Sequence, residues 1–164
     1  MSEPMGWQRL VQRLASLRPM SWVLAHTLHI VDRPLLKWSK GRASLASALT
    51  GLPIAMLTTV GAKSGRKRTT PLVALMDGAT VVLVASFFGN RHHPAWHYNL
   101  RAHPEAMVEF GGREEVYAAR EAAPEQRAAY WRRAVGLYAG YAAYEARAAG
   151  RKIPIWVLTK KTTG

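Results

Sequence analysis

The chain has 164 residues, of which 49% are hydrophobic and 20% charged, so its composition excludes a disordered chain and fits a single globular domain. It contains no cysteine, which excludes disulfides, thiolate metal sites and cysteine nucleophiles and fits a reducing cytoplasm. Its formal net charge of +13 predicts an anionic partner, and nucleic acid, an anionic membrane surface and an acidic ligand are all open at this point.

Residues 1–50 are predicted to form a helical extension ahead of the main domain. Apolar residues recur there at helical spacing, namely Trp7, Leu10, Val11, Leu14 and Leu17. The extension is strongly basic, and a basic amphipathic helix either lies on an anionic lipid surface or docks on its own domain, so both interpretations stay open. The apolar run over residues 22–31 is too short to span a bilayer. We therefore expect a cytoplasmic protein, either soluble or peripheral on the inner face of the cell membrane.

Residues 51–164 are predicted to form the main domain, in which hairpins alternate with helices. Apolar runs bounded by turn residues predict strands over residues 53–60, 69–76, 79–87, 106–110, 114–120 and 153–159. Helical spacing predicts one helix over residues 93–103 and a long alanine-rich helix over residues 124–149. Consecutive hairpins favour a mostly antiparallel sheet of about six strands, closed into a small barrel with helices packed outside it. The expected fold class is therefore α+β.

The most informative stretch is the turn between the first two strands, within the sequence LTTVGAKSGRKRTTPLVAL at residues 57–75. Its positive charges, which no acidic residue interrupts, come from Lys63, Arg66, Lys67 and Arg68. Such charges, with backbone N–H groups and hydroxyls around them, suit a phosphate or a string of carboxylates. A basic glycine turn taken alone is more often a solvated hairpin, but the polar Thr69 and Thr70 that follow favour a binding site. The turn is not a Walker A loop, because it lacks that spacing and precedes a strand.

The histidines do not predict a metal site. His93 and His97 stand four residues apart, but Pro94 lies between them and no glutamate supplies a zinc-binding H-E-x-x-H pattern. A hydrogen bond to a ligand, or a helix cap, is the better interpretation for His92 or His93. Ser86 follows an apolar strand without the G-x-S-x-G elbow of a serine nucleophile.

Three tyrosines, Tyr138, Tyr141 and Tyr144, are predicted to line a partly wet pocket wall. Steps of three residues on a helix turn by about 60°, so the phenols fan across one broad face. Phenols can stack on a flat ring and donate a hydrogen bond or a proton, whereas surface tyrosines of an amphipathic helix are the alternative. Gly136 and Gly140 weaken this helix and suggest a mobile segment that closes over a substrate.

Four motifs occur in order along the chain: T-T-V-G-A-K-S-G-R-K-R-T-T-P-L, V-A-S-F-F-G, H-P-A-W-H-Y-N-L and I-P-I-W-V-L. Together they resemble the deazaflavin (F420)-dependent nitroreductase family over about residues 50–160. The resemblance implies a split β-barrel that binds coenzyme F420, whose reduced form is the hydride donor. It also implies a membrane-facing role for the N-terminal segment, since several relatives are membrane-associated.

The resemblance further implies which residues form the site. Those implied to hold the phosphate and glutamate tail of F420 are Lys63, Ser64, Gly65 and Arg68. Those implied to line the groove for the deazaflavin ring are Thr69, Thr70, Pro71, Leu72, Val73, Val84, Ala85, Ser86 and Phe87, with the far side closed by Trp96, His97, Tyr98 and Asn99. Those implied to form the substrate pocket and act in catalysis are Ser86, Tyr138, Tyr141 and Tyr144, of which Tyr141 also contacts the cofactor.

Three positions depart from the best-known member of that family. Ala62 stands in place of an arginine, Phe87 in place of a lysine and Val73 in place of a pocket tyrosine. The pocket is therefore more apolar, and a quinone fits it better than a nitroimidazole prodrug.

We accordingly expect an F420H2-dependent reductase that passes a hydride to an apolar acceptor such as a quinone or a nitro compound. One alternative is an F420 carrier without turnover. Another is a basic nucleic-acid-binding barrel, but aromatic platforms along one strand face are missing, so we expect no nucleic acid partner.

Overall fold

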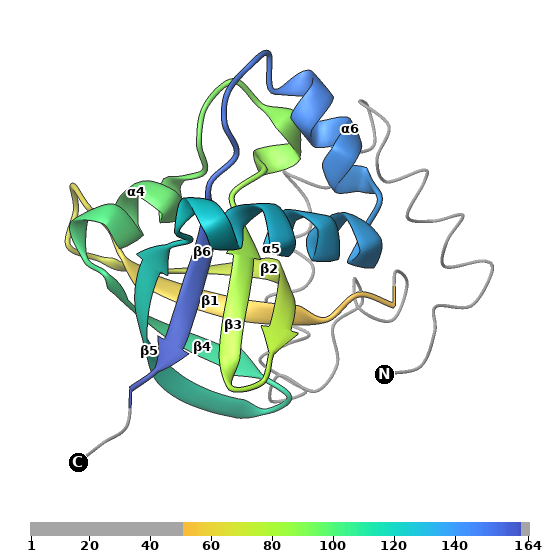
Figure 1. Ribbon diagram of the computed structural model, residues 1–164. Helices are drawn as coiled ribbons and strands as arrows, with labels where there is room; N and C mark the ends of the chain where they lie inside the picture. Colours follow the sequence, from red (N-terminus) through yellow and green to blue (C-terminus); the bar gives the residue numbers. More distant parts are fainter. Residues whose placement is uncertain (1–50, 162–164) are drawn as a thin grey trace.

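The computed structural model describes residues 51–161, in which six strands close into a barrel (Figure 1). The strands are β1 (Ile54–Val60), β2 (Lys67–Asp77), β3 (Thr80–Val84), β4 (Glu105–Phe110), β5 (Arg113–Glu121) and β6 (Ile155–Lys160). Their order around the barrel is β1-β2-β3-β6-β5-β4, with β1 also paired to β4, and every pairing is antiparallel. The predicted antiparallel barrel of about six strands is confirmed.

Helices pack on the outside of this barrel, as predicted. They are the short 3-10 helix η1 (Phe87–Gly89) and the α-helices α4 (Ala95–Ala102), α5 (Pro124–Leu137) and α6 (Gly140–Arg147). In Figure 1, α5 extends across the upper end of the barrel and α6 follows it beside η1. Among residues 51–161, no helix is long and apolar enough to cross a membrane. The predicted extension over residues 1–50, with its lipid-binding interpretation, lies outside the described residues.

Glycine turns make the two tight hairpins that the sequence predicts. The first lies between β2 and β3 and the second between β4 and β5. Gly78 has a φ of 61°, Gly111 of 60° and Gly112 of 78°. This is the left-handed backbone that two-residue hairpins use and that glycine adopts without steric cost. The turns therefore fix the register of both hairpins.

Buried apolar side chains from all six strands fill the barrel. Leu83 of β3 lies directly opposite Trp156 of β6, and the two are 1% and 3% exposed. Burying side chains of this size contributes roughly 1.5–3 kcal/mol each. Trp96 and Leu100, four residues apart on one face of α4, belong to the same cluster. This face of α4 therefore packs against the barrel core.

The predicted single helix over residues 124–149 is wrong, because the chain forms two helices there. Tyr138 has an extended backbone (φ −144°, ψ 103°), and its N–H bonds to the carbonyl of Ala134 where α5 ends. A Cβ atom at Gly140 would overlap the ring and hydroxyl of Tyr138. The helix breaks because the Tyr138 phenol folds back over this glycine, where its hydroxyl lies 2.9 Å from that of Tyr144.

Several strand boundaries also differ from the prediction by one to three residues, and two of them have a clear physical reason. β3 ends at Val84 rather than at Phe87, because Phe87 and Phe88 have left-handed backbones that cannot continue a strand. β2 begins earlier than expected, at Lys67, because this residue still pairs with Val60 of β1. The basic turn is therefore shorter and closer to the sheet than the sequence indicated.

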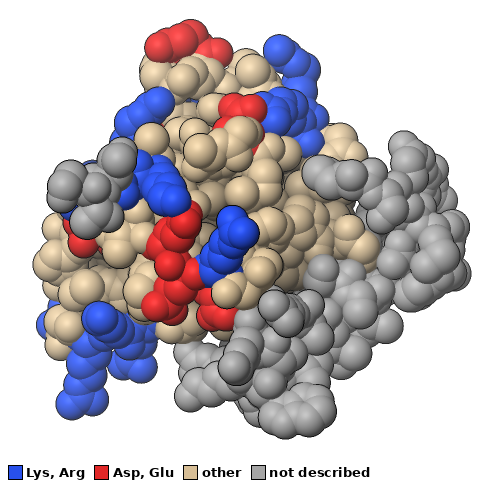
Figure 2. Space-filling view, turned by 90° about the horizontal axis from the view of Figure 1, so that it is seen from below, with Lys and Arg blue, Asp and Glu red and all other residues tan. Residues whose placement is uncertain are grey.

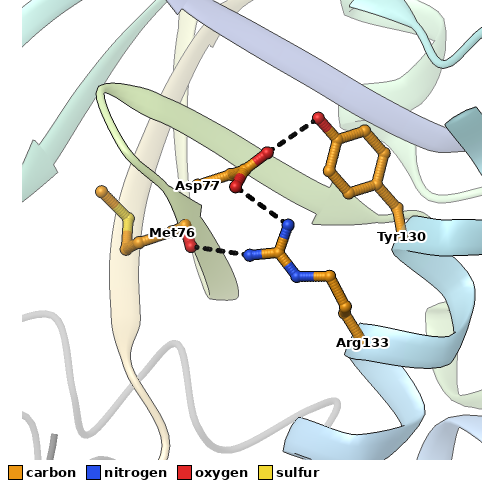
Figure 3. Close-up of polar contacts among 4 residues, drawn as sticks. All are labelled: Met76, Asp77, Tyr130 and Arg133. Carbon is orange, nitrogen blue, oxygen red and sulfur yellow. Dashed lines mark hydrogen bonds and ion pairs between the residues drawn. The ribbon is translucent and has the colours of Figure 1, made fainter.

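One cluster of polar contacts fastens α5 to the end of β2 (Figure 3). The Asp77 carboxylate accepts a hydrogen bond from the Tyr130 hydroxyl at 3.1 Å and pairs with the Arg133 guanidinium at 2.9 Å. Arg133 also donates to the carbonyl of Met76. Hydrogen bonds from Arg133 and then Tyr130 hold the pKa of Asp77 below its ordinary value. These contacts join α5 to the end of β2 at the surface of the barrel.

We predict that Gly140→Ala and Gly136→Ala shift stability in opposite directions. Gly140→Ala forces the Tyr138 ring away, and the free energy of unfolding should fall by about 1–3 kcal/mol. Gly136 lies in α5 with open space where a Cβ atom would stand, so Gly136→Ala should raise that free energy by about 0.5–1 kcal/mol. Urea unfolding followed by circular dichroism measures both. Equal effects would show that Tyr138 does not depend on Gly140.

Candidate active site

The turn between β1 and β2 presents its cations to solvent. Hydrogen bonds close its backbone, from the Gly61 N–H to the Arg66 carbonyl at 2.9 Å and from the Gly65 N–H to the Gly61 carbonyl at 2.8 Å. The exposed cations here, none of which forms an ion pair within residues 51–161, are Lys63, Arg66, Lys67 and Arg68. They are therefore available to an anionic ligand.

Asn99 fastens this turn to α4. Its Oδ1 accepts a hydrogen bond from the N–H of Ala62 at 2.9 Å, and its Nδ2 donates to Oγ1 of Thr59 at 3.0 Å. Asn99 and Thr59 are both buried, where losing a hydrogen bond is costly. The resemblance implied a contact between Asn99 and the deazaflavin ring. In the protein alone, Asn99 holds the backbone that carries the cations.

The neighbours of Asn99 on α4 differ in exposure. Trp96 is buried in the barrel core, whereas Tyr98 is 47% exposed. His97 is buried, and its Nδ1 accepts a hydrogen bond from Nε1 of Trp156 at 3.0 Å. Burial, followed by the charge of nearby His93, lowers the pKa of His97 to about 4. The His97 imidazole is therefore neutral near pH 7, with its proton on Nε2.

Ser86 opens a strained loop. Ser86 itself is buried, and the next two residues, Phe87 and Phe88, have φ values of 48° and 56°. A non-glycine residue in this left-handed region costs about 1–3 kcal/mol. The Gly89 N–H bonds to the Ser86 carbonyl at 3.1 Å and completes the single turn of η1. Such strain persists only where surrounding contacts hold it.

Arg151 supplies those contacts. Its guanidinium donates to the carbonyls of Ser86 at 2.8 Å, Asn90 at 2.9 Å and Ala85 at 3.4 Å. It also donates to Nδ1 of His93 at 2.9 Å, and burial followed by the charge of Arg151 lowers the pKa of His93. One side chain thus fixes both ends of the strained loop. Arg151 was not predicted from the sequence, because its partners lie 58 to 66 residues away along the chain.

The tyrosine cluster, formed by Tyr138, Tyr141 and Tyr144, is buried, with exposures of 6%, 5% and 3%. Neither the partly wet wall nor the surface alternative describes this geometry. The rings pack edge to face, with centroids 5.4 Å apart for Tyr138 and Tyr141 and 6.2 Å apart for Tyr141 and Tyr144. Burial raises the pKa of Tyr138 and of Tyr141. Both phenols therefore keep their protons at neutral pH.

The Ser86 loop and the tyrosine cluster form one packed unit. Phe88 lies edge-on to Tyr144, with ring centroids 5.7 Å apart. A Cβ atom at Gly89 would lie 2.7 Å from the Tyr144 carbonyl oxygen and 2.8 Å from Cβ of Arg147, so η1 and α6 are in close backbone contact. The structure therefore brings Ser86 together with the predicted pocket tyrosines.

β2 connects this unit with the basic turn. Lys67 lies at the turn end of β2, whereas Val73 packs against the buried apolar cluster that contains the three tyrosines. The two residues are six strand steps apart, which is about 20 Å, so their side chains share one face of β2. The predicted ring-groove residues Thr69–Val73 are half-buried along this path, while Val84 is buried with the tyrosines and Ala85 in the barrel core. In Figure 1 the turn lies at the left beside α4 and α6 lies at the upper right, so only an elongated ligand reaches both.

Charge is not spread evenly over the described surface. Seen from below, Figure 2 shows acidic side chains gathered between basic ones on that face. Across the strands, Lys160 pairs with Glu115 and Lys161 with Glu105, each at 2.6 Å. Within residues 51–161, no group of histidine and acidic side chains is arranged to hold a metal ion. The basic turn adds to this surface four neighbouring cations that form no ion pair among the described residues.

We predict that Arg151→Lys loosens the Ser86 loop. Lysine keeps the charge but lacks the planar fork, so it cannot make all four hydrogen bonds. Hydrogen exchange at the amides of Gly89 and Asn90 should become about 10-fold faster or more, and the free energy of unfolding should fall by about 1–3 kcal/mol. Arg132→Lys, at an exposed position of α5, is the matched control. Unchanged exchange at both amides would contradict the role of Arg151.

Comparison with known proteins identifies relatives of this chain. Residues 36–160 match the family described as F420H(2)-dependent quinone reductase. The F420H(2)-dependent quinone reductase Rv1261c of Mycobacterium tuberculosis (strain ATCC 25618 / H37Rv) is 33% identical over 112 residues, which cover 66% of this chain and 74% of that protein.

Solved structures agree with the sequence relatives. One described as an F420-H2 dependent reductase (FDR-A) is 37% identical with a TM-score of 0.60, covering 65% of this chain and 93% of that chain. Another, described as a domain-swapped dimer, is 33% identical with a TM-score of 0.62, covering 86% of this chain and 99% of that chain. The F420-dependent resemblance carried by the four motifs is confirmed, and with a match over most of its length the chain belongs to the F420H2-dependent quinone reductase family.

Proposed function

We propose that this protein transfers a hydride from reduced coenzyme F420 to a quinone along β2, between the basic turn and the tyrosine cluster. As a member of its family, the protein is an F420H2-dependent oxidoreductase. One observation supports placing the reaction along β2. Cations that form no ion pair among the described residues stand at one end of a path of about 20 Å, and apolar and phenolic side chains stand at the other.

The basic turn fits the anionic part of the cofactor. Lys63 and Arg68 are exposed and form no ion pair within the described residues, so an anion does not have to displace a carboxylate from them. Ser64 adds a hydroxyl, whose Oγ lies 3.3 Å from the Arg66 N–H. We assign the phosphate and glutamate tail to this turn. When bound, reduced F420 supplies the hydride and, overall, one proton, so that a quinone leaves as the hydroquinone.

Apolar side chains at the other end favour a quinone as the acceptor. Val73 and Phe88 pack against the buried apolar cluster that contains the three tyrosines, and Phe87 is 38% exposed next to Ser86. These side chains bury the flat ring of a quinone at little cost, whereas a nitro group loses its hydration there. Nitro compounds are therefore expected to be the poorer acceptors.

Tyr141 is the proposed proton donor to the quinone oxygen. Burial raises its pKa, so its phenol carries the proton at neutral pH and can hydrogen-bond or protonate a developing oxyanion. Because Tyr141 is 5% exposed, an acceptor reaches it only when α6 moves. α6 has only 8 residues and follows the break at Tyr138, which gives it a hinge.

The cofactor assignment predicts that Lys63→Gln combined with Arg68→Gln weakens F420 binding about 10- to 100-fold. Each change removes a charge-assisted hydrogen bond, and affinity should also become less sensitive to salt. Quenching of F420 fluorescence measures the dissociation constant at two salt concentrations. Lys160→Gln, whose charge is already paired with Glu115, is the control and should bind normally. Equal affinity in the double variant would refute the role of the turn.

The catalytic assignment predicts that Tyr141→Phe lowers kcat about 10-fold or more with menadione, a soluble quinone. The dissociation constant for F420 should stay within about twofold, because phenylalanine keeps the packing of the ring. Oxidation of F420H2 followed by absorbance measures turnover, and thermal unfolding checks that the variant is folded. An unchanged kcat would exclude Tyr141 as the donor. Binding of F420H2 without any oxidation in the wild type would instead indicate a carrier.

A further inference from the structure

A cavity of about 240 Å³ lies between α4, the end of β5, the start of α5 and the segment that leads into β6. Its charged lining consists of Arg101, Arg127, Lys152 and Glu121. We propose that this cavity binds a small oxyanion, a phosphate or an organic carboxylate, at a place separate from the cofactor path along β2.

Cations outnumber acids around the cavity. Arg101 comes from α4, Arg127 from α5 and Lys152 from the segment before β6, so three separate elements direct positive charge to one place. Glu121, at the end of β5, is the one carboxylate in the lining. None of the three cations forms an ion pair within residues 51–161. Like charges held close together are unfavourable unless an anion binds among them.

Arg127 shows most directly that an acceptor is missing. Its guanidinium is fixed in place, because one NH2 group donates to the Ile153 carbonyl at 3.1 Å and the plane lies 5.8 Å from the Trp131 ring centre. Its Nε is buried and has no hydrogen-bond partner among the described residues. A buried N–H without an acceptor costs about 1–3 kcal/mol, and this cost is removed when a ligand supplies an oxygen.

Two neutral imidazoles complete the polar lining. His97 accepts at Nδ1 from Trp156, and His93 accepts at Nδ1 from Arg151, so both rings carry their proton on Nε2. Each therefore has a donor left for an oxyanion. Pro154 adds an apolar wall. The volume lies below that of sites for drug-sized ligands, so a single small anion is the best fit.

Helix geometry separates the cavity from the basic turn. Asn99 binds the turn from one face of α4. Arg101 and His97 each stand two residues from Asn99, which is a rotation of about 200°, so they lie on the opposite face of the helix. An anion held by Arg101 and the cofactor tail held by the turn therefore occupy different sides of α4.

Binding of inorganic phosphate and of succinate to the full chain tests the proposal. Isothermal titration calorimetry in buffers matched for ionic strength with sodium chloride should show saturable binding of at least one of them. Lys152→Gln and Arg101→Gln should each weaken that binding about 10-fold or more, and Glu121→Gln should strengthen it. Arg132→Gln, an exposed change on α5, is the matched control. Comparing the two probes distinguishes a phosphate site from a carboxylate site.

The anion site is independent of the cofactor assignment. The Lys63→Gln and Arg68→Gln double variant should bind the small anion normally, and the anion should leave F420 affinity unchanged. Arg127→Lys keeps the charge but lacks the buried Nε–H, so it should also weaken binding; if it fails to fold, Lys152→Gln and Arg101→Gln decide. The proposal is overturned if neither probe binds saturably, if the lining variants bind like Arg132→Gln, or if F420 competes with the anion.

Discussion

The pairing of β3 with β6 is the contact on which the rest of the structure depends. It joins residues 71 to 79 positions apart, from Val84 opposite Ile155 to Thr80 opposite Thr159, and so closes the barrel. Where the two strands leave the sheet, the chain segments beyond them are necessarily neighbours. Arg151 can therefore reach the Ser86 loop, and Trp156 can reach His97. The contacts that hold the Ser86 loop and the His97 side chain therefore depend on this one pairing.

The architecture divides the chemistry between rigid and adjustable parts. β2 is a continuous strand of the barrel, and it sets the distance between the basic turn and the tyrosine cluster. The Ser86 loop is strained and is held by a single arginine, while α6 is short and separated from α5 by a break. In the proposed function, the rigid strand fixes where the elongated cofactor would lie, and the less regular elements around Ser86 would give an acceptor room to enter and leave.

Sequence patterns predicted the structural features that depend on residues close together in the chain. The hairpin at Gly111 and Gly112 and the buried alternation in the strands follow from backbone preference and from the period of two residues, so the barrel was predictable from the sequence. The helix break at Tyr138 was not predictable, because alanine-rich sequence favours helix throughout and only the burial of one phenol overrides it.

The site was predictable only in part, for a related reason. The cations of the turn are adjacent in sequence, so their convergence was visible before the fold was known. Arg151 and Arg127 donate hydrogen bonds to carbonyls that are far away along the chain. No neighbouring residue in the sequence indicates either contact, so the roles of these two arginines could not be predicted.

The position of β6 in the barrel also has a consequence for how the protein is made. β6 lies between β3 and β5, yet it follows both of them in the chain, after α5 and α6. During synthesis, β3 and β5 therefore expose unpaired edges until β6 has left the ribosome. Long-range strand pairing of this kind folds slowly, and open edges invite contacts with other chains. The nascent barrel thus stays in its most aggregation-prone form until nearly all of the described chain has been translated.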